Sequence, residues 1–163
     1  MRRFFDTSVL VYAYDAADEA KRAIARSLIQ EAIAEASFVV STQVLAEFYS
    51  TVARGKLIRP ERALDLVRNW AALDAVPQTP DLVVRGIALH QQHSLALWDA
   101  LIVQAALDAS CLELVTEDMQ HGRRFGELEI VNPFLAGSAH ERAAPYRATG
   151  KRARSRRPVR PRA

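Results

Sequence analysis

Short, mostly apolar segments alternate along this chain with longer segments in which apolar residues recur at helical spacing. The short segments have the length of buried strands and lie at residues 3–5, 38–40, 75–76, 112–115 and 130–131. The segments between them are predicted to be helices, at residues 7–14, 18–36, 42–54, 61–73, 81–92 and 97–109. This alternation favours an α/β sandwich, in which a parallel sheet of short strands carries helices on both faces.

Composition excludes several classes of protein. The chain has 163 residues, half of them hydrophobic, which is enough for one domain with its own core. Its single cysteine, Cys111, excludes an internal disulfide framework and fits a reducing compartment. No apolar run approaches the ~20 residues of a membrane helix, and the acidic residues after Arg2-Arg3 do not fit a signal peptide. We therefore expect a cytoplasmic protein that makes no membrane contact.

The charge of the chain is divided unevenly between two regions. Residues 137–163 contain nine Lys or Arg and one Glu, a net charge of +8, so residues 1–136 carry the difference from the total of +3, which is −5. The basic region has few apolar side chains, and we expect it to be a disordered tail. It is either a solubilising extension or an arm that binds a polyanion. The predicted domains are therefore the body, 1–136, and the tail, 137–163.

Two acidic residues follow predicted strands directly. Asp6 comes after the strand at 3–5, and Asp118 lies just beyond the strand at 112–115. Ligands of open α/β sheets bind beyond the carboxyl ends of the strands, so both positions are candidates for a site. The alternatives are a helix cap for Asp6 and an ordinary polar loop for Asp118.

Two more acidic residues lie on predicted helices. Glu47 is on the rim of an apolar stripe, where an ordinary boundary glutamate is the alternative. Asp99 stands at the head of an apolar helical face, and the preceding Leu97 and Trp98 indicate burial. A buried carboxylate is costly unless it is paired, hydrogen-bonded or bound to a cation, although an Asp also stabilises a helix N-terminus.

In a parallel sheet these four carboxylates converge on one edge. They would repel one another and could not all stay ionised without a cation. Ligands that are all oxygen select a hard divalent ion, Mg²⁺ or Mn²⁺. Such ions suit phosphoryl chemistry, because they activate a water and neutralise charge on the leaving oxygen.

Four stretches of the sequence, in this order and spacing, resemble the PIN-domain ribonucleases, and within them the VapC toxins of toxin–antitoxin pairs. The stretches are Phe5-Asp6-Thr7-Ser8-Val9-Leu10-Val11-Tyr12, Ser41-Thr42-Gln43-Val44-Leu45-Ala46-Glu47-Phe48, Leu97-Trp98-Asp99-Ala100-Leu101-Ile102 and Thr116-Glu117-Asp118-Met119-Gln120-His121-Gly122. The resemblance covers residues 1 to about 135, so it implies nothing about the tail.

The resemblance implies a PIN-type α/β/α sandwich and a metal-dependent endoribonuclease that is usually a homodimer. It implies a small cognate antitoxin whose C-terminal segment fills the groove of the active site. The family's acidic residues, which hold Mg²⁺ and carry the catalysis, correspond to Asp6, Glu47, Asp99 and Asp118. Glu117 could share or take the role of Asp118, and polar supports would come from Thr7 or Ser8, Thr116 and Gln43.

Two other functions stay open at this point. Asp6 could be the nucleophile of a phosphatase, although a haloacid-dehalogenase-like site would want a second Asp where Ser8 stands. The chain could also be a nucleic-acid-binding protein that uses its tail. RNA contacts of the body could come from His121, Arg123 and Arg124, or from the basic group Arg54, Lys56, Arg59 and Arg62, although such groups commonly form solvated faces.

Overall fold

The computed structural model describes residues 1–135, which form a six-stranded sheet with the strand order β3-β2-β1-β4-β6-β5. The strands are β1 (Arg3–Phe5), β2 (Phe38–Ser41), β3 (Ala75–Val76), β4 (Glu113–Val115), β5 (Arg124–Phe125) and β6 (Leu128–Val131). All neighbouring strands are parallel except β5, which runs antiparallel to β6. The predicted sheet of short, mainly parallel strands is therefore confirmed, and β5 is a strand that the sequence analysis did not include.

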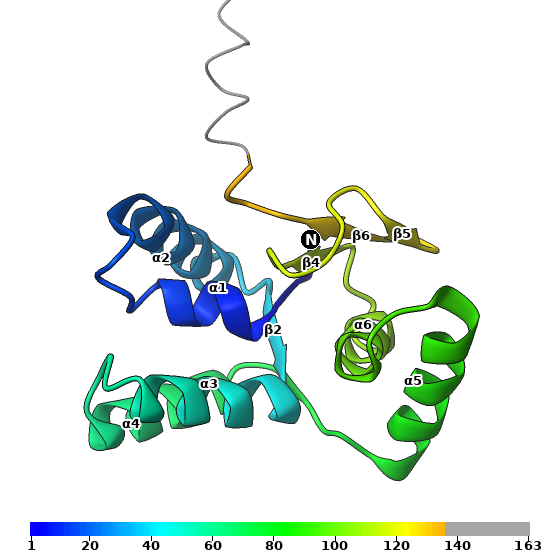
Figure 1. The fold of residues 1–163 in the computed structure, drawn as a ribbon, viewed down its shortest axis with the longest axis horizontal. Helices are drawn as coiled ribbons and strands as arrows, with labels where there is room; N and C mark the ends of the chain where they lie inside the picture. Colours follow the sequence, from blue (N-terminus) through cyan, green and yellow to red (C-terminus); the bar gives the residue numbers. More distant parts are fainter. Residues whose placement is uncertain (136–163) are drawn as a thin grey trace, which may run out of the picture.

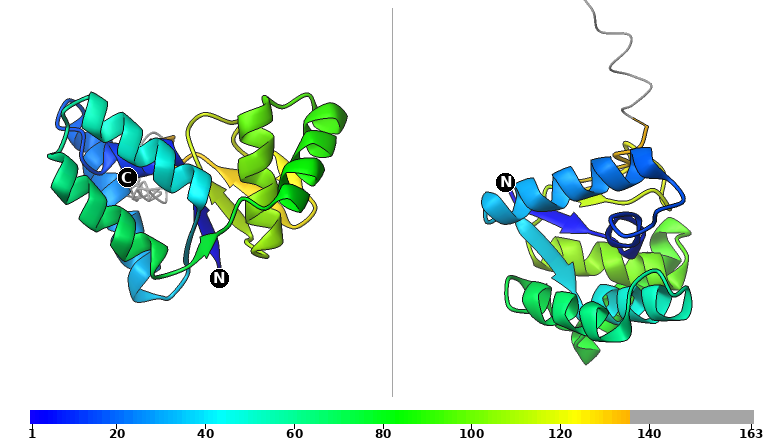
Figure 2. Two further views of the ribbon diagram at one scale, coloured as in Figure 1. Left: turned by 90° about the horizontal axis from the view of Figure 1, so that it is seen from below. Right: turned by 90° about the vertical axis from the view of Figure 1, so that its left-hand side faces the viewer.

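Six helices cover the two faces of this sheet. They are α1 (Thr7–Tyr12), α2 (Glu19–Ala34), α3 (Thr42–Arg54), α4 (Pro60–Ala71), α5 (Pro80–His93) and α6 (Leu97–Asp108). Helices α1 to α4 lie on one side of the strands and α5 and α6 on the other, as Figures 1 and 2 both show. The predicted α/β/α sandwich is thus confirmed, with helix boundaries that shift by only a few residues.

Aromatic rings form much of the core on the side of α1 to α4. The ring of Phe5 stacks on that of Phe38 at 5.1 Å between centroids, which joins β1 to β2. Phe48 on α3 meets Trp70 on α4 edge to face at 4.8 Å, and Tyr14 packs against both rings. Buried aromatic side chains contribute much of the stability of such a core, so this cluster fixes α3 and α4 against the strands.

On the other side, α6 is enclosed between the sheet and α5. Its residues from Ala100 to Ala106 are all buried, as expected for a helix that is apolar around its whole circumference. Helix α5 approaches it closely at Gly86, where an added Cβ would lie 2.6 Å from Cδ2 of Leu101. The position of α6 fixes Asp99, in its first turn, near the sheet edge.

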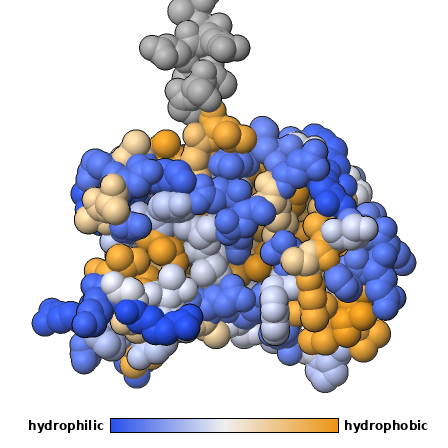
Figure 3. Space-filling model, viewed as in Figure 1, coloured by the Kyte–Doolittle hydropathy of each residue, from blue (hydrophilic) through white to orange (hydrophobic). Residues whose placement is uncertain are grey.

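The surface of the described part carries exposed apolar side chains as well as charged ones. Figure 3 shows hydrophobic surface over the outer part of α5, where Val84 and Ile87 are exposed. No helix within residues 1–135 has the length and apolar character needed to cross a membrane. The predicted tail, 137–163, lies outside the described residues, so its disorder and the domain boundary stay predictions.

Candidate active site

A cavity of about 430 Å³ opens at the carboxyl ends of β1 and β4. These two strands end level with each other, since Phe5 pairs with Val115, and the backbone N–H of Asp6 donates to the carbonyl of Val115 at 3.0 Å. The chain leaves β1 toward β2 and β3 on one side, and β4 returns to its other side. The cavity therefore lies where the strand order reverses, the usual place for a ligand in an open α/β sheet.

All four acidic residues chosen from the sequence line this cavity: Asp6, Glu47, Asp99 and Asp118. They come from four separate segments, namely the end of β1, helix α3, the start of α6 and the loop after β4. The topology of the sheet thus brings together side chains that are up to 112 positions apart in the chain.

Asp6 is the most buried of the four, with 4% of its surface exposed. It caps α1, because Oδ1 accepts a hydrogen bond from the backbone N–H of Thr7 at 2.6 Å, and Oδ2 accepts one from the Thr116 hydroxyl at 2.6 Å. Burial raises the pKa of Asp6 to about 6, with smaller upward contributions from the charges of Asp118 and Glu47, while the two hydrogen bonds act in the opposite direction. Asp6 is therefore both the helix cap that was considered and a member of the acidic cluster.

Glu47 is held in place by two neighbouring polar side chains. The hydroxyl of Thr7 donates to Oε2 at 2.9 Å, and the amide of Gln43, one turn earlier on α3, donates to Oε1 at 2.9 Å. Thr7 is thus shared between two acidic residues, through its backbone N–H to Asp6 and its hydroxyl to Glu47. The predicted supporting positions of Thr7 and Gln43 are confirmed.

Asp99 is half-buried at the start of α6, and burial is the main cause that raises its pKa, followed by the charges of Asp118 and Glu47. The argument that placed it in a buried environment was wrong in one respect. Leu97 and Trp98 are 37% and 61% exposed, because the first turn of α6 projects beyond the sheet edge. Trp98 instead forms part of the cavity wall, a role the sequence did not indicate.

Asp118 and Glu117 are adjacent but differently engaged. Asp118 is exposed, and its backbone N–H donates to the Thr116 hydroxyl oxygen at 3.1 Å, which ties its loop to the same threonine that binds Asp6. Glu117 accepts a hydrogen bond from the Tyr12 hydroxyl through one oxygen and pairs with the Lys21 ammonium at 2.6 Å through the other. Glu117 is therefore already paired with a cationic side chain, whereas Asp118 forms no ion pair within residues 1–135.

The donor set fits a hard divalent cation in its chemistry. Six carboxylates border the cavity, because Asp15 and Glu117 line it together with the four described above. The hydroxyl oxygen of Ser8, which also lines it, is buried without a hydrogen-bond partner among the described residues. Within residues 1–135, however, no three His, Cys, Asp or Glu side chains lie close enough together to form a ready-made metal cluster. Like charges with no cation between them repel, so an open arrangement of the four carboxylates is expected.

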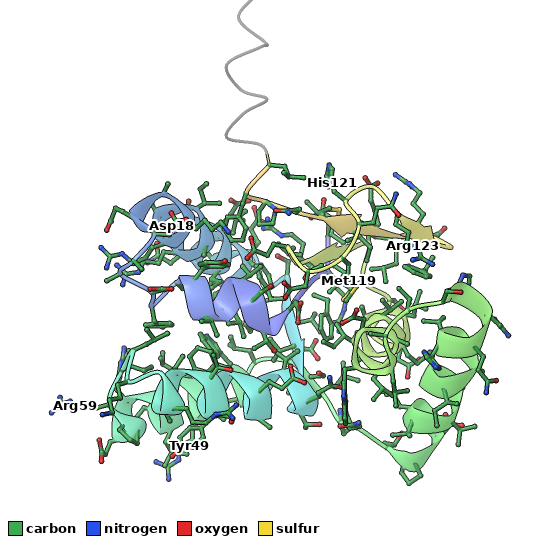
Figure 4. The ribbon with its side chains drawn as sticks, viewed as in Figure 1. Asp18, Tyr49, Arg59, Met119, His121 and Arg123 are labelled. Atoms are coloured by element: carbon green, nitrogen blue, oxygen red, sulfur yellow. The ribbon has the colours of Figure 1, made fainter. Side chains whose placement is uncertain are left out.

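Several other residues chosen from the sequence lie away from this cavity. His121 accepts a hydrogen bond from the backbone N–H of Asn132 at 3.2 Å and is not part of the cavity wall (Figure 4). Arg54 is not in the wall of this cavity but borders a neighbouring depression of about 440 Å³, which Thr7 and Glu47 also line. The sequence analysis gave no role to Asp15 and Tyr12, which line the cavity, or to Lys21, which pairs with Glu117.

The model of the PIN domain family matches residues 3–125, about three-quarters of the chain. The chain belongs to the PIN domain family. The match begins in β1 and ends in β5, so it includes every segment that supplies the cavity with a carboxylate. No curated protein matches the chain significantly.

Solved structures share the fold of this PIN domain at low sequence identity. A toxin–antitoxin complex from Klebsiella pneumoniae has a TM-score of 0.61 at 20% identity, covering 80% of this chain and 97% of the other. VapBC2 from Rickettsia felis, bound to a DNA fragment from its promoter, has a TM-score of 0.57 at 20% identity, covering 81% and 98%. VapC20 from Mycobacterium tuberculosis, a toxin that cleaves the sarcin–ricin loop, has a TM-score of 0.53 at 21% identity, covering 69% and 86%.

Proposed function

We propose that this PIN domain is a metal-dependent endoribonuclease and the toxin of a toxin–antitoxin pair, acting in the cytoplasm. The observation that carries the proposal is the convergence of four carboxylates on one cavity at the carboxyl edge of the sheet. The family match and the shared fold of the toxin structures support it.

In this proposal Asp6, Glu47, Asp99 and Asp118 hold Mg²⁺, for which Mn²⁺ can substitute, and the same four residues are the catalytic ones. When bound, the ion would lower the pKa of a water and stabilise the leaving oxygen of a phosphodiester. Asp6 must release its proton to serve as a ligand, and the hydrogen bonds from Thr7 and Thr116 favour that release. Thr7 and Gln43 orient Glu47 toward the cavity.

The structure favours Asp118 over Glu117 as the fourth ligand, because the Lys21 ammonium already neutralises the charge of Glu117, whereas the donors to Asp6 and Glu47 are uncharged. These adjacent residues make a matched pair of variants. We expect Asp118→Asn to lower RNA cleavage in Mg²⁺ by roughly a hundredfold or more, and Glu117→Gln to lower it less than roughly tenfold. Equal losses in the two variants would assign the ligand role to both residues.

The test of the function itself is the cleavage of RNA by the full chain with Mg²⁺ and with EDTA. Asp99→Asn should abolish cleavage while the circular dichroism spectrum stays unchanged. Full activity in this variant would remove Asp99 from the mechanism. The nucleic-acid-binding alternative predicts no metal-dependent cleavage and a loss of RNA binding on deletion of residues 137–163.

The phosphatase alternative would need Asp6 as a free nucleophile. Both oxygens of Asp6 accept hydrogen bonds, and the side chain is almost completely buried. This environment fits a fixed ligand better than an attacking group. A phosphoryl group trapped on Asp6 after incubation with a phosphate ester would nevertheless establish the phosphatase.

For the partners, we propose a cognate antitoxin that covers the cavity and a homodimer of this chain. Apolar surface for such contacts is present at the exposed side chains of α5 and in a groove between α3 and α4. Tyr49, which Figure 4 labels on α3, lines this groove together with Leu64 of α4. Light scattering of the purified chain, alone and with the co-expressed antitoxin, tests both assemblies.

A further inference from the structure

A second, smaller cavity lies beside the active-site cavity and shares two of its residues. Its volume is about 170 Å³, and Asp99 and Asp118 belong to the walls of both cavities. A nucleic-acid strand with its phosphate at these carboxylates would therefore reach the second cavity with the next nucleotide. The volume, less than half of that of the larger cavity, suits one planar ring rather than an extended polymer.

Arg123 in the wall of this cavity is held in a fixed position. Its guanidinium donates a hydrogen bond through Nη2 to the carbonyl of His93 at 2.7 Å and lies over the ring of Phe125, 4.9 Å from the centroid. Phe125 is only 5% exposed and packs against the His93 ring. Within residues 1–135 Arg123 forms no ion pair with an acidic side chain.

The rest of the wall presents groups that match the edge and face of a base. Gln120 offers an amide with both donors and an acceptor, and Met119 offers a buried apolar surface. Figure 4 shows Met119 and Arg123 on the loop between β4 and β5, on the side nearer to α5 and α6. A planar guanidinium, an amide and an apolar side chain are the kinds of group on which proteins stack and read unpaired bases.

We propose that this second cavity binds the base of a nucleotide next to the scissile phosphate, with the Arg123 guanidinium stacked on the base. The proposal rests on the proposed ribonuclease function, which it extends to the substrate. A phosphate is the other group that an arginine attracts, so the test includes a variant that separates stacking on a base from attraction of a phosphate.

The test uses short RNA oligonucleotides that contain the cleavage site, either intact or with one abasic residue at each flanking position in turn. Wild type should cleave the oligonucleotide with one particular abasic position roughly tenfold more slowly than the intact one. Arg123→Met should cleave intact RNA roughly tenfold more slowly and lose the additional effect of that abasic position. Arg68→Met is the matched control, since Arg68 lies on α4 outside the cavity and pairs with Asp65, and it should behave as wild type.

Arg123→Lys separates stacking from charge, because it keeps the charge but not the planar group. It should resemble Arg123→Met if the base stacks on Arg123, and wild type if Arg123 contacts a phosphate. The proposal is overturned if Arg123→Lys behaves as wild type, or if no abasic position slows the wild-type enzyme. Thermal unfolding of each variant controls for folding.

The same oligonucleotides are also compared by fluorescence anisotropy in EDTA, which measures binding without cleavage. Wild type should bind the critical abasic oligonucleotide roughly tenfold more weakly than the intact one, and Arg123→Met should bind the two alike. The binding measurement tests the base-binding cavity even if intact RNA is not cleaved. Absence of cleavage would contradict only the ribonuclease function and not the base-binding proposal. Equal wild-type affinity for all the oligonucleotides would overturn the base-binding proposal.

Discussion

The buried carboxylate of Asp6 should make this protein less stable at neutral pH than the same protein with an uncharged side chain there. Burial raises the pKa of Asp6 from 3.8 to about 6. Between these pH values the folded chain keeps a proton that the unfolded chain has released, so the free energy of unfolding falls as the pH rises through this interval. At about 1.4 kcal/mol per pH unit, the full cost above pH 6 is about 3 kcal/mol.

Asp6→Asn removes this cost but loses part of the hydrogen bonding. The amide oxygen of Asn still accepts from the backbone N–H of Thr7, whereas the Thr116 hydroxyl loses an acceptor, which costs about 1 kcal/mol. In EDTA we therefore expect the variant to be about 2 kcal/mol more stable than wild type at about pH 8. The difference should decline and change sign toward about pH 4, where the wild-type carboxyl is protonated in the folded chain.

Urea unfolding followed by circular dichroism across this pH range measures the difference. Asp65→Asn, an exposed site on α4, is the control and should leave the pH profile unchanged. Mg²⁺ at roughly a hundred times its dissociation constant should stabilise wild type by about 2.7 kcal/mol and the Asn variant much less, which reverses the order of the two proteins. If the Asn variant in EDTA has no advantage at about pH 8, the reasoning that links burial of Asp6 to stability is refuted.

Two further variants test other parts of the structure. Thr116→Val removes a buried hydroxyl that donates to Asp6 and accepts from the backbone N–H of Asp118, so it should lower the free energy of unfolding by about 1–3 kcal/mol. Because this hydroxyl lowers the pKa of Asp6, its loss should also raise the pH at which Mg²⁺ begins to stabilise the protein. Thermal unfolding with Mg²⁺ across the pH range measures this shift. An unchanged pH midpoint would contradict this link to Asp6. Gly86→Ala should lower the free energy of unfolding by about 1–3 kcal/mol despite the better helix propensity of Ala, because the added Cβ meets Leu101. In a Leu101→Ala background, urea unfolding should show a smaller loss of stability from the same substitution. An equal loss in both backgrounds would place the strain elsewhere.

Most of the fold was predictable because the residue pattern within each strand and helix is typical of the structure that the segment adopts. The strands at 3–5 and 38–40 consist largely of residues that are buried on both faces, which is typical of a parallel sheet between two helical layers. Ser41 caps α3 and Pro60 begins α4, so both helices start where their sequences indicate.

The hairpin of β5 and β6 was missed although the sequence carries a signal for it. Phe125 pairs with Leu128, so the loop has two residues, and Gly126 adopts the positive φ of 61° that such tight turns favour. Strand β5 has only two residues, too few to show an alternating pattern. A glycine between two apolar positions was therefore the only local indication of the hairpin.

The acidic residues of the site were predictable for a different reason from its supporting contacts. Asp6 follows β1 directly and Asp118 lies in the loop just beyond β4, so local sequence already places them at the sheet edge. The bond of Lys21 to Glu117 joins residues 96 positions apart, and that of Tyr12 joins residues 105 apart. Such contacts have no local pattern, which is why the sequence left the roles of Glu117 and Asp118 open. In the structure these two contacts engage Glu117 and not Asp118.

The place of the cavity and its chemistry have separate origins in this molecule. The place follows from topology, because β4 returns beside β1 after the chain has crossed to the other face of the sheet. Any chain with this strand order would open a crevice there, and structures with about 20% identity share the fold. The chemistry depends instead on individual side chains that the fold does not specify. The comparison of Asp118→Asn with Glu117→Gln is therefore more informative than any further likeness of fold, because it changes the chemistry at adjacent positions and leaves the topology intact.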